Sequence, residues 1–115
     1  MSAERMRRVD EAMREVLSGA ITQNLKDPRI GFVTVTAVET TPDLRRAKVF
    51  VSVLDAEVER KLTMAGLVSA HGFLQKLVAR ELRLKYTPTL DFVYDDTAER
   101  AQRVSRLLEQ EEEEA

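Results

Sequence analysis

Two adjacent acidic side chains, Asp95 and Asp96, are candidates for acid–base chemistry, because a pair of carboxyl groups can hold different pKa values. The same residue type also favours turns and helix N-termini, where its oxygens accept hydrogen bonds from backbone N–H groups. Glu99 follows Asp96 at the spacing of a capping box. We therefore interpret the pair as the end of a strand and the start of a helix.

His71 is the single histidine of the chain and the natural candidate for a general base. Ser69 lies near it in sequence, but no motif makes the two a nucleophile and its base. The chain has no cysteine, which excludes disulfides and thiolate metal sites, and its four glycines form neither a dinucleotide-binding motif nor a P-loop. We therefore expect a protein without enzymatic activity, which binds no cofactor, no metal and no small-molecule substrate. We favour an exposed turn residue for His71, with contact to a phosphate or a base as the alternative.

Basic side chains form three clusters, a pattern that suits contact with nucleic-acid phosphates. The basic side chains at positions 76, 80 and 83 follow the i, i+4, i+7 spacing that puts side chains on one side of a helix. A solvated basic surface is the alternative interpretation. The candidate RNA-binding residues are Arg5, Arg7 and Arg8; Arg29, Arg45, Arg46 and Lys48; Lys76, Arg80, Arg83 and Lys85; and His71.

The aromatic residues do not alternate with these cations. The pattern of apolar positions places four of them in the core of strands: Phe32, Phe50, Phe92 and Tyr94. A stacking platform for single strands is therefore not expected, and recognition of the phosphates and the shape of structured RNA fits better.

The net charge of −2 hides an uneven distribution along the chain. Residues 109–115 hold five of the 20 acidic residues, so the rest has 18 basic and 15 acidic residues and a net charge of +3. An acidic run of this kind is typical of a disordered end. We expect a domain over residues 1–108 and a disordered tail over residues 109–115. Neither an apolar run of membrane-spanning length nor a secretory signal is recognisable, so we expect a cytoplasmic protein that binds no membrane.

The elements that must position these residues follow from hydrophobic periodicity and turn composition. They are a helix over 3–25, strands over 30–39 and 46–54 that pair antiparallel, two helices within 57–84 that meet at Gly72, a strand over 89–94, and a helix from Asp96 to about 108. This order, α–β–β–α–α–β–α, predicts an α+β domain with helices covering one face of a three-stranded sheet.

Several stretches together resemble the ribosome-binding factor A family. They are DPRIGFVTVT at 27–36, Asp43-Leu44 with AKVFVS at 47–52, AHGFL at 70–74 and LRLK at 82–85, with Pro88, Leu90, Phe92, Asp95 and the starting pattern Arg5…Arg8-Val9. The resemblance covers residues 5 to about 108. It implies a KH-like fold of the bacterial type with the same element order.

The resemblance also implies a helix kink at Ala70-His71-Gly72, where ordinary KH domains carry a GxxG clamp. We expect a small side chain at Ala70 and a positive φ at Gly72. The sequence has no GxxG, so the usual grip on four nucleotides is not expected. Gln75 stands where the family often has arginine, which would weaken one phosphate contact, and the short acidic tail leaves no tail function to carry over.

The function that the resemblance implies is ribosome assembly. Members bind the free 30S small ribosomal subunit and assist late maturation of its 16S rRNA, including processing at the 5′ end, and they are associated with growth in the cold. They act without catalysis and usually as monomers. A general KH-like RNA-binding module with a non-ribosomal RNA target is the alternative, and a hydrolase is a distant third.

Overall fold

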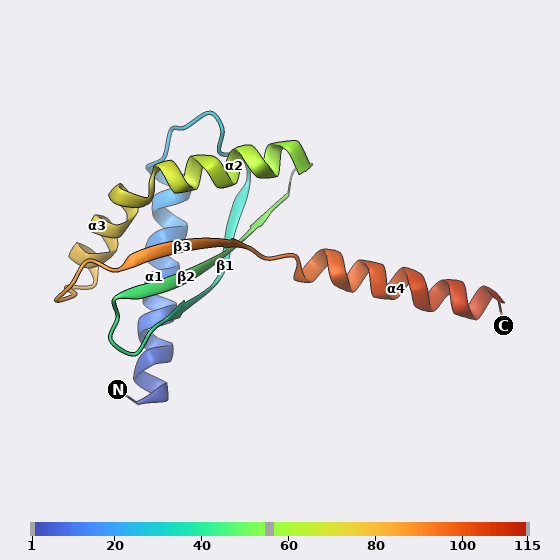
Figure 1. Ribbon diagram of the computed structural model, residues 1–115, viewed down its shortest axis with the longest axis horizontal. Helices are drawn as coiled ribbons and strands as arrows, with labels where there is room; N and C mark the ends of the chain where they lie inside the picture. The colour runs from blue at the N-terminus through green and yellow to red at the C-terminus, as the bar shows by residue number, and fades with distance from the viewer. Residues whose placement is uncertain (1, 55–56, 115) are drawn as a thin grey trace.

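A computed structural model describes residues 2–54 and 57–114 and gives the expected α+β architecture in the order α–β–β–α–α–β–α (Figure 1). The elements are α1 (Ala3–Gln23), β1 (Val33–Thr40), β2 (Arg46–Val53), α2 (Glu57–Ser69), α3 (His71–Glu81), β3 (Thr89–Tyr94) and α4 (Thr97–Glu114).

The sheet has the strand order β1-β2-β3. β1 and β2 pair antiparallel, as predicted, whereas β2 and β3 run parallel, with Arg46 opposite Thr89. A parallel pair needs a crossover connection, and here α2 and α3 supply it. One residue of β1, Thr36, has no partner in the register, because Val35 pairs with Val51 and Ala37 with Phe50. This β-bulge lets both Val35 and Val38 enter the core at a spacing of three residues.

One hydrophobic core joins the sheet to α1, α2 and α3. In Figure 1, α1 crosses behind the strands, and its buried side chains repeat at helical spacing. The buried core residues are Met13, Leu17, Ala20, Ile21, Val35, Val38, Ala47, Val49, Val51, Leu67, Leu74, Val78 and Leu90. Burial alternates along β2, so its other side chains face away from this core. That second face of the sheet is the open face.

The helix kink lies at Ala70 and not at Gly72. Ala70 separates α2 from α3 with φ −88° and ψ 0°, and its N–H donates to the carbonyls of Gly66 and Leu67, each at 3.1 Å. Gly72 belongs to α3, and no glycine of the described chain has a positive φ. A Cβ on Gly72 would meet no atom within 4 Å. The expected positive φ at Gly72 is therefore wrong, because one non-helical residue before it already makes the bend.

α3 ends earlier than its composition predicts. The N–H of Leu84 donates to the carbonyl of Ala79 at 2.9 Å, and that of Arg83 to the carbonyl of Arg80 at 3.3 Å, which is a Schellman motif. Arg83 takes the left-handed conformation of this motif, with φ 51°. It lies beyond the end of α3. The expectation that Arg83 shares one side of a helix with positions 76 and 80 is therefore wrong.

The last helix is longer than the sequence predicts, which ends it at about residue 108. α4 continues through Glu114, and every side chain from Thr97 to Glu113 is exposed. Figure 1 shows α4 projecting away from the sheet. No boundary between elements falls at residue 108, so the division into a domain and a tail remains a prediction, and residue 115 lies outside the described residues.

Candidate nucleic-acid interface

Arg29 belongs to a clamp that fixes the loop between α1 and β1. Its backbone N–H and its guanidinium both donate to the carboxylate of Asp27, at 2.9 Å for the backbone and 2.6 Å for the closest side-chain contact. These hydrogen bonds lower the pKa of Asp27 to about 2, from an ordinary value of 3.8. Because its guanidinium is already paired with Asp27, Arg29 is less available for contact with a ligand.

The same loop is anchored on α2. Thr63, fully buried, accepts a hydrogen bond from the N–H of Gly31 at 3.1 Å and donates to the carbonyl of Arg29 at 3.2 Å. Ile30 packs against the backbone of Gly66, where a Cβ would lie 2.6 Å from its Cγ1. The Asp27–Gly31 motif thus builds the fold, and Gly66 allows the loop to approach the helix.

The N-terminal basic cluster lies at the opposite end of α1 from Arg29. Arg8 pairs with Glu4 at 3.0 Å, and Arg7 lines a shallow hollow beside β1. Arg5 is exposed in the first turn. A helix of 21 residues is about 30 Å long, so these arginines and Arg29 cannot form one contact surface.

A different group of cations comes together where the β1–β2 turn meets the loop before β3. The N–H of Thr89 donates to the carbonyl of Arg45 at 2.8 Å, which joins the two segments. The guanidinium carbon of Arg45 lies 4.0 Å from the ring centroid of Tyr86, and the amine of Lys85 lies 5.6 Å from it. We call this region the basic end; it comprises Arg45, Arg46, Lys48, Arg83, Lys85 and Tyr86.

The parallel register between β2 and β3 creates the basic end. Arg46 stands opposite Thr89, so the residues just before each strand lie side by side. The second and third clusters of the sequence are therefore regrouped. Arg45 and Lys85 are brought together around Tyr86, Arg46 and Lys48 follow along β2, Arg83 precedes Lys85 by two residues, and Arg29 is excluded.

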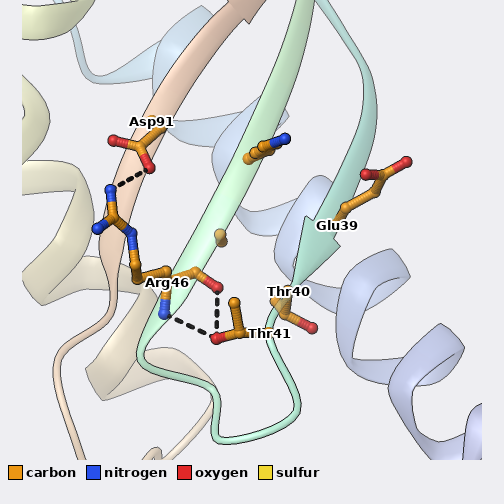
Figure 2. A pocket seen from close by; sticks show the side chains of 7 residues that line it. Glu39, Thr40, Thr41, Arg46 and Asp91 are labelled. Carbon is orange, nitrogen blue, oxygen red and sulfur yellow. Dashed lines mark hydrogen bonds and ion pairs between the residues drawn. The ribbon is translucent and has the colours of Figure 1, made fainter.

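A hollow of about 340 Å³ opens on the open face beside the basic end (Figure 2). Arg46 crosses one side of it and pairs with Asp91 at 3.0 Å. The hydroxyl of Thr41 accepts from the N–H of Arg46 at 3.2 Å and donates to the carboxylate of Asp43 at 2.6 Å. Lys48 stands between Glu39 and Asp91 in the register. The mixed charge makes this hollow less attractive to phosphate than Arg45 and Lys85, which lie beside Tyr86.

A second hollow, of about 360 Å³, lies between the α2–α3 kink and β3, and His71 lines it. The Nδ1 of His71 lies 2.6 Å from the carbonyl oxygen of Val68, which can only accept, so this nitrogen donates the hydrogen bond. Nearby, the amide oxygen of Gln75 accepts from the N–H of Leu90 at 3.3 Å. Gln75 thus ties α3 to the edge of β3, a structural role that the sequence does not indicate.

Lys76 and Arg80 lie one turn apart on α3, and both are accessible to solvent. Arg80 also approaches Glu81, with Nε 3.7 Å from a carboxylate oxygen, but both side chains are more than half exposed and the pair is strongly screened. Since α3 leads directly into the loop of Arg83 and Lys85, these two cations extend the basic surface along the helix.

The aromatic assignments need correction. Phe32 precedes β1 and is 78% exposed, and Phe50 is partly exposed on the open face, so neither is core. Phe92 packs against the core as expected. Tyr86, which sequence reasoning missed, is 43% exposed among the cations. The available signal was its place in a turn directly after the basic run at positions 83 and 85.

Asp95 and Asp96 have structural partners. Asp95 accepts from the N–H of Thr97 at 3.0 Å and from the hydroxyl of Thr36 at 2.8 Å, and hydrogen bonds from these residues lower its pKa. Asp96 pairs with Arg100 at 3.0 Å. Glu99 contacts the hydroxyl of Tyr94 and does not close a capping box. The pair ends β3 and starts α4, as interpreted from the sequence.

Neither a metal cluster nor a membrane-spanning helix occurs in the described part of the chain. No group of three or more ligand side chains within residues 2–54 and 57–114 could hold a metal ion. Over the same ranges, no helix has the length and apolar character needed to cross a bilayer.

Comparison with known proteins gives one consistent family. The sequence model of ribosome-binding factor A matches residues 5–108. The ribosome-binding factor A of Halothermothrix orenii is 46% identical over 114 residues, which cover 99% of this chain and 93% of that protein. The crystal structure of ribosome-binding factor A from Thermus thermophilus has a TM-score of 0.69 at 27% identity, covering 77% of this chain and 94% of that chain. A homology model of the Thermus thermophilus protein, fitted into a cryo-EM map of a 30S complex, has a TM-score of 0.62 at 28% identity and covers 76% and 91%.

Proposed function

Because the chain belongs to the ribosome-binding factor A family, we propose that it binds the free 30S small ribosomal subunit as an assembly factor. It assists late maturation of the 16S rRNA, including processing at the 5′ end, and supports growth in the cold. It acts in the cytoplasm as a monomer, through binding alone and without a cofactor.

The observation that carries this proposal is the family match together with a relative seen on the 30S subunit. The Thermus thermophilus protein has been fitted into a map of its 30S complex, and it shares the fold of this chain at 28% identity. The basic end supports the same partner, because rRNA phosphates are the dense anionic surface that a cluster of exposed cations attracts. In the acidic pair considered for catalysis, Asp95 accepts from the backbone N–H of Thr97 and Asp96 pairs with Arg100. Both carboxylates therefore have structural partners, which favours a function carried by binding.

The proposed contact surface runs from α3 to the basic end. Lys76 and Arg80 approach the RNA from the helix, and Arg45, Arg83 and Lys85 approach it from the two loops. His71 lines the adjoining hollow, where its imidazole can form a hydrogen bond with a ribose hydroxyl. Arg29, which is clamped to Asp27, and Arg8, which lies at the far end of α1 from Arg29, contribute less.

The experiment is sedimentation of a cell lysate through a sucrose gradient, probed for this protein at low and at physiological salt. We expect it to migrate with free small subunits and to be absent from assembled ribosomes. Charge reversal at Lys85 is the matched variant, and it should move the protein toward the top of the gradient. Recovery of the unmodified protein only in ribosome-free fractions would contradict the proposal and favour a general RNA-binding module with another RNA target.

A further inference from the structure

Tyr86 is an aromatic residue that the fold does not use as core. Its side chain is 43% exposed, and no hydrogen bond reaches its hydroxyl from the residues that the structure describes. Tyr94, the other tyrosine, differs in both respects. Its hydroxyl contacts Glu99, and its ring lies under Arg60 at 4.4 Å, so it ties α2 and β3 to the start of α4. Tyr86 shares the contact with an arginine, since Arg45 lies 4.0 Å from its ring centroid, but among the described residues its hydroxyl has no partner like Glu99.

The backbone that carries Tyr86 is nevertheless held at both ends. Before it, the Schellman motif fixes Arg83 at φ 51° and bonds Leu84 back to α3. After it, Pro88 is fully buried, and the N–H of Thr89 donates to Arg45 at 2.8 Å. An exposed ring on a fixed backbone is preorganised, so a ligand that covers it loses little conformational entropy.

The surroundings of the ring indicate what would cover it. The guanidinium of Arg45 lies 4.0 Å from its centroid, and the amine of Lys85 lies 5.6 Å from it. A phosphate alone would need only the cations. A nucleotide presents a flat base and a phosphate within one unit, which matches an aromatic ring flanked by cations.

We propose that Tyr86 and the Arg45 guanidinium form a stacking site for one unpaired base of a single-stranded RNA segment. The base extends the stack of ring and guanidinium, while Lys85 and Arg83 contact the neighbouring phosphates. This inference rests on the proposed rRNA-binding function and deepens it, because it requires the rRNA segment at the basic end to be single-stranded. It also replaces the sequence-based expectation that no stacking platform exists.

Tyrosine fluorescence gives a direct test, because the chain has two tyrosines and no tryptophan. In the Tyr94→Phe variant, Tyr86 is the only remaining tyrosine, and the ring beside Arg60 is kept. This variant is titrated with an eight-nucleotide single-stranded RNA and, separately, with inorganic polyphosphate of equal charge. We expect the RNA to quench the emission of Tyr86 and the polyphosphate to leave it nearly unchanged. Equal responses to the two ligands would overturn the stacking site.

Affinity measurements on the otherwise unmodified chain provide the second arm. Tyr86→Ala should weaken binding of the RNA roughly ten-fold, whereas Tyr86→Phe should retain it. Phe32→Ala, at an aromatic residue that is 78% exposed in the α1–β1 loop, is the matched control and should bind as the unmodified chain does. None of the three changes should alter binding of polyphosphate. An unchanged RNA affinity in Tyr86→Ala would also overturn the proposal.

The unmodified chain is assayed in parallel for sedimentation with purified 30S subunits. If it binds the subunit and Tyr86→Ala binds the RNA equally well, the stacking site is wrong and the proposed function stands. If the unmodified chain fails to bind the subunit, the proposed function itself is wrong, and with it the rRNA-stacking site.

Discussion

Arg83 should stabilise the contact with RNA while destabilising the fold. It occupies the left-handed position that ends α3, with φ 51°, where glycine is the preferred residue. A non-glycine residue in this conformation costs about 1–2 kcal/mol. Arg83→Gly removes this cost. The greater conformational freedom of glycine in the unfolded chain reduces the resulting gain in stability by about 0.5–1 kcal/mol.

The net expectation for Arg83→Gly is a free energy of unfolding higher by about 0.5–1 kcal/mol. For a domain of this size, that change raises the melting temperature by roughly 2–4 °C. The same substitution removes one phosphate-binding cation. The slope of log affinity against log salt should then become shallower by about 0.7–0.9, the contribution of one phosphate contact.

Thermal denaturation and 30S binding at several salt concentrations measure the two effects. Arg83→Ala is the control, because alanine loses the charge and keeps the strained φ. It should weaken subunit binding as Arg83→Gly does and leave the melting temperature near that of the unmodified chain. A lower melting temperature for Arg83→Gly would refute the strain argument, and unchanged salt dependence would remove Arg83 from the interface.

Three further predictions follow from the clamp, the glycines and the basic end. Gly66→Ala should destabilise the fold by about 1–3 kcal/mol in chemical denaturation, because its Cβ would lie 2.6 Å from Ile30 Cγ1. Gly72→Ala has open space around its Cβ and should be neutral or stabilising by up to about 1 kcal/mol. Equal effects of the two substitutions would contradict the close packing of Ile30 on Gly66. Asp27→Asn should lower the melting temperature at pH 7. Folding lowers the pKa of Asp27 from 3.8 to about 2, so its contribution to stability is complete above pH 3.8 and is lost as the pH falls toward 2. The melting temperatures of the unmodified chain and of Asp27→Asn should therefore converge as the pH approaches 2. A difference in melting temperature that does not depend on pH would contradict the Asp27–Arg29 clamp. Lys85→Glu should weaken 30S binding with little change in melting temperature. Lys61→Glu, a charge reversal at an exposed residue of α2, should bind more nearly as the unmodified chain does. Equal losses of 30S affinity in the two variants would indicate an effect of net charge and not of the basic end.

The sequence predicts the elements well because their signals are local. The apolar spacing of α1, with Met13 and Leu17 one turn apart, specifies a helix whatever packs against it. Alternation along β2 specifies which side chains enter the core, and the turn around Pro42 specifies the antiparallel pairing with β1.

The features that the sequence misses depend on partners distant along the chain or on unusual backbone. The bulge at Thr36 exists only in the register of β1 on β2. The α2–α3 bend uses Ala70, although glycine is the residue that usually indicates such a break. The left-handed Arg83 is hidden because an arginine there looks like a continuing helix.

The candidate site shows the same division. Each cation could be identified from the sequence, but their grouping could not. The parallel register of β2 on β3 places Arg45 against Tyr86, and a hydrogen-bonded clamp removes Arg29 from the set. Tyr86 itself carries no sequence signal beyond its position after a basic run.

The equilibrium affinity for purified 30S subunits, measured across a series of salt concentrations, shows whether the basic end holds the chain on the free small subunit. For about five phosphate contacts, log affinity should fall with log salt at a slope of about −3.5 to −4.5. The double variant Arg45→Glu with Lys85→Glu should bind far more weakly and with a shallower slope, at an unchanged melting temperature. An affinity independent of salt, or an equal affinity and slope in the double variant, would contradict the account.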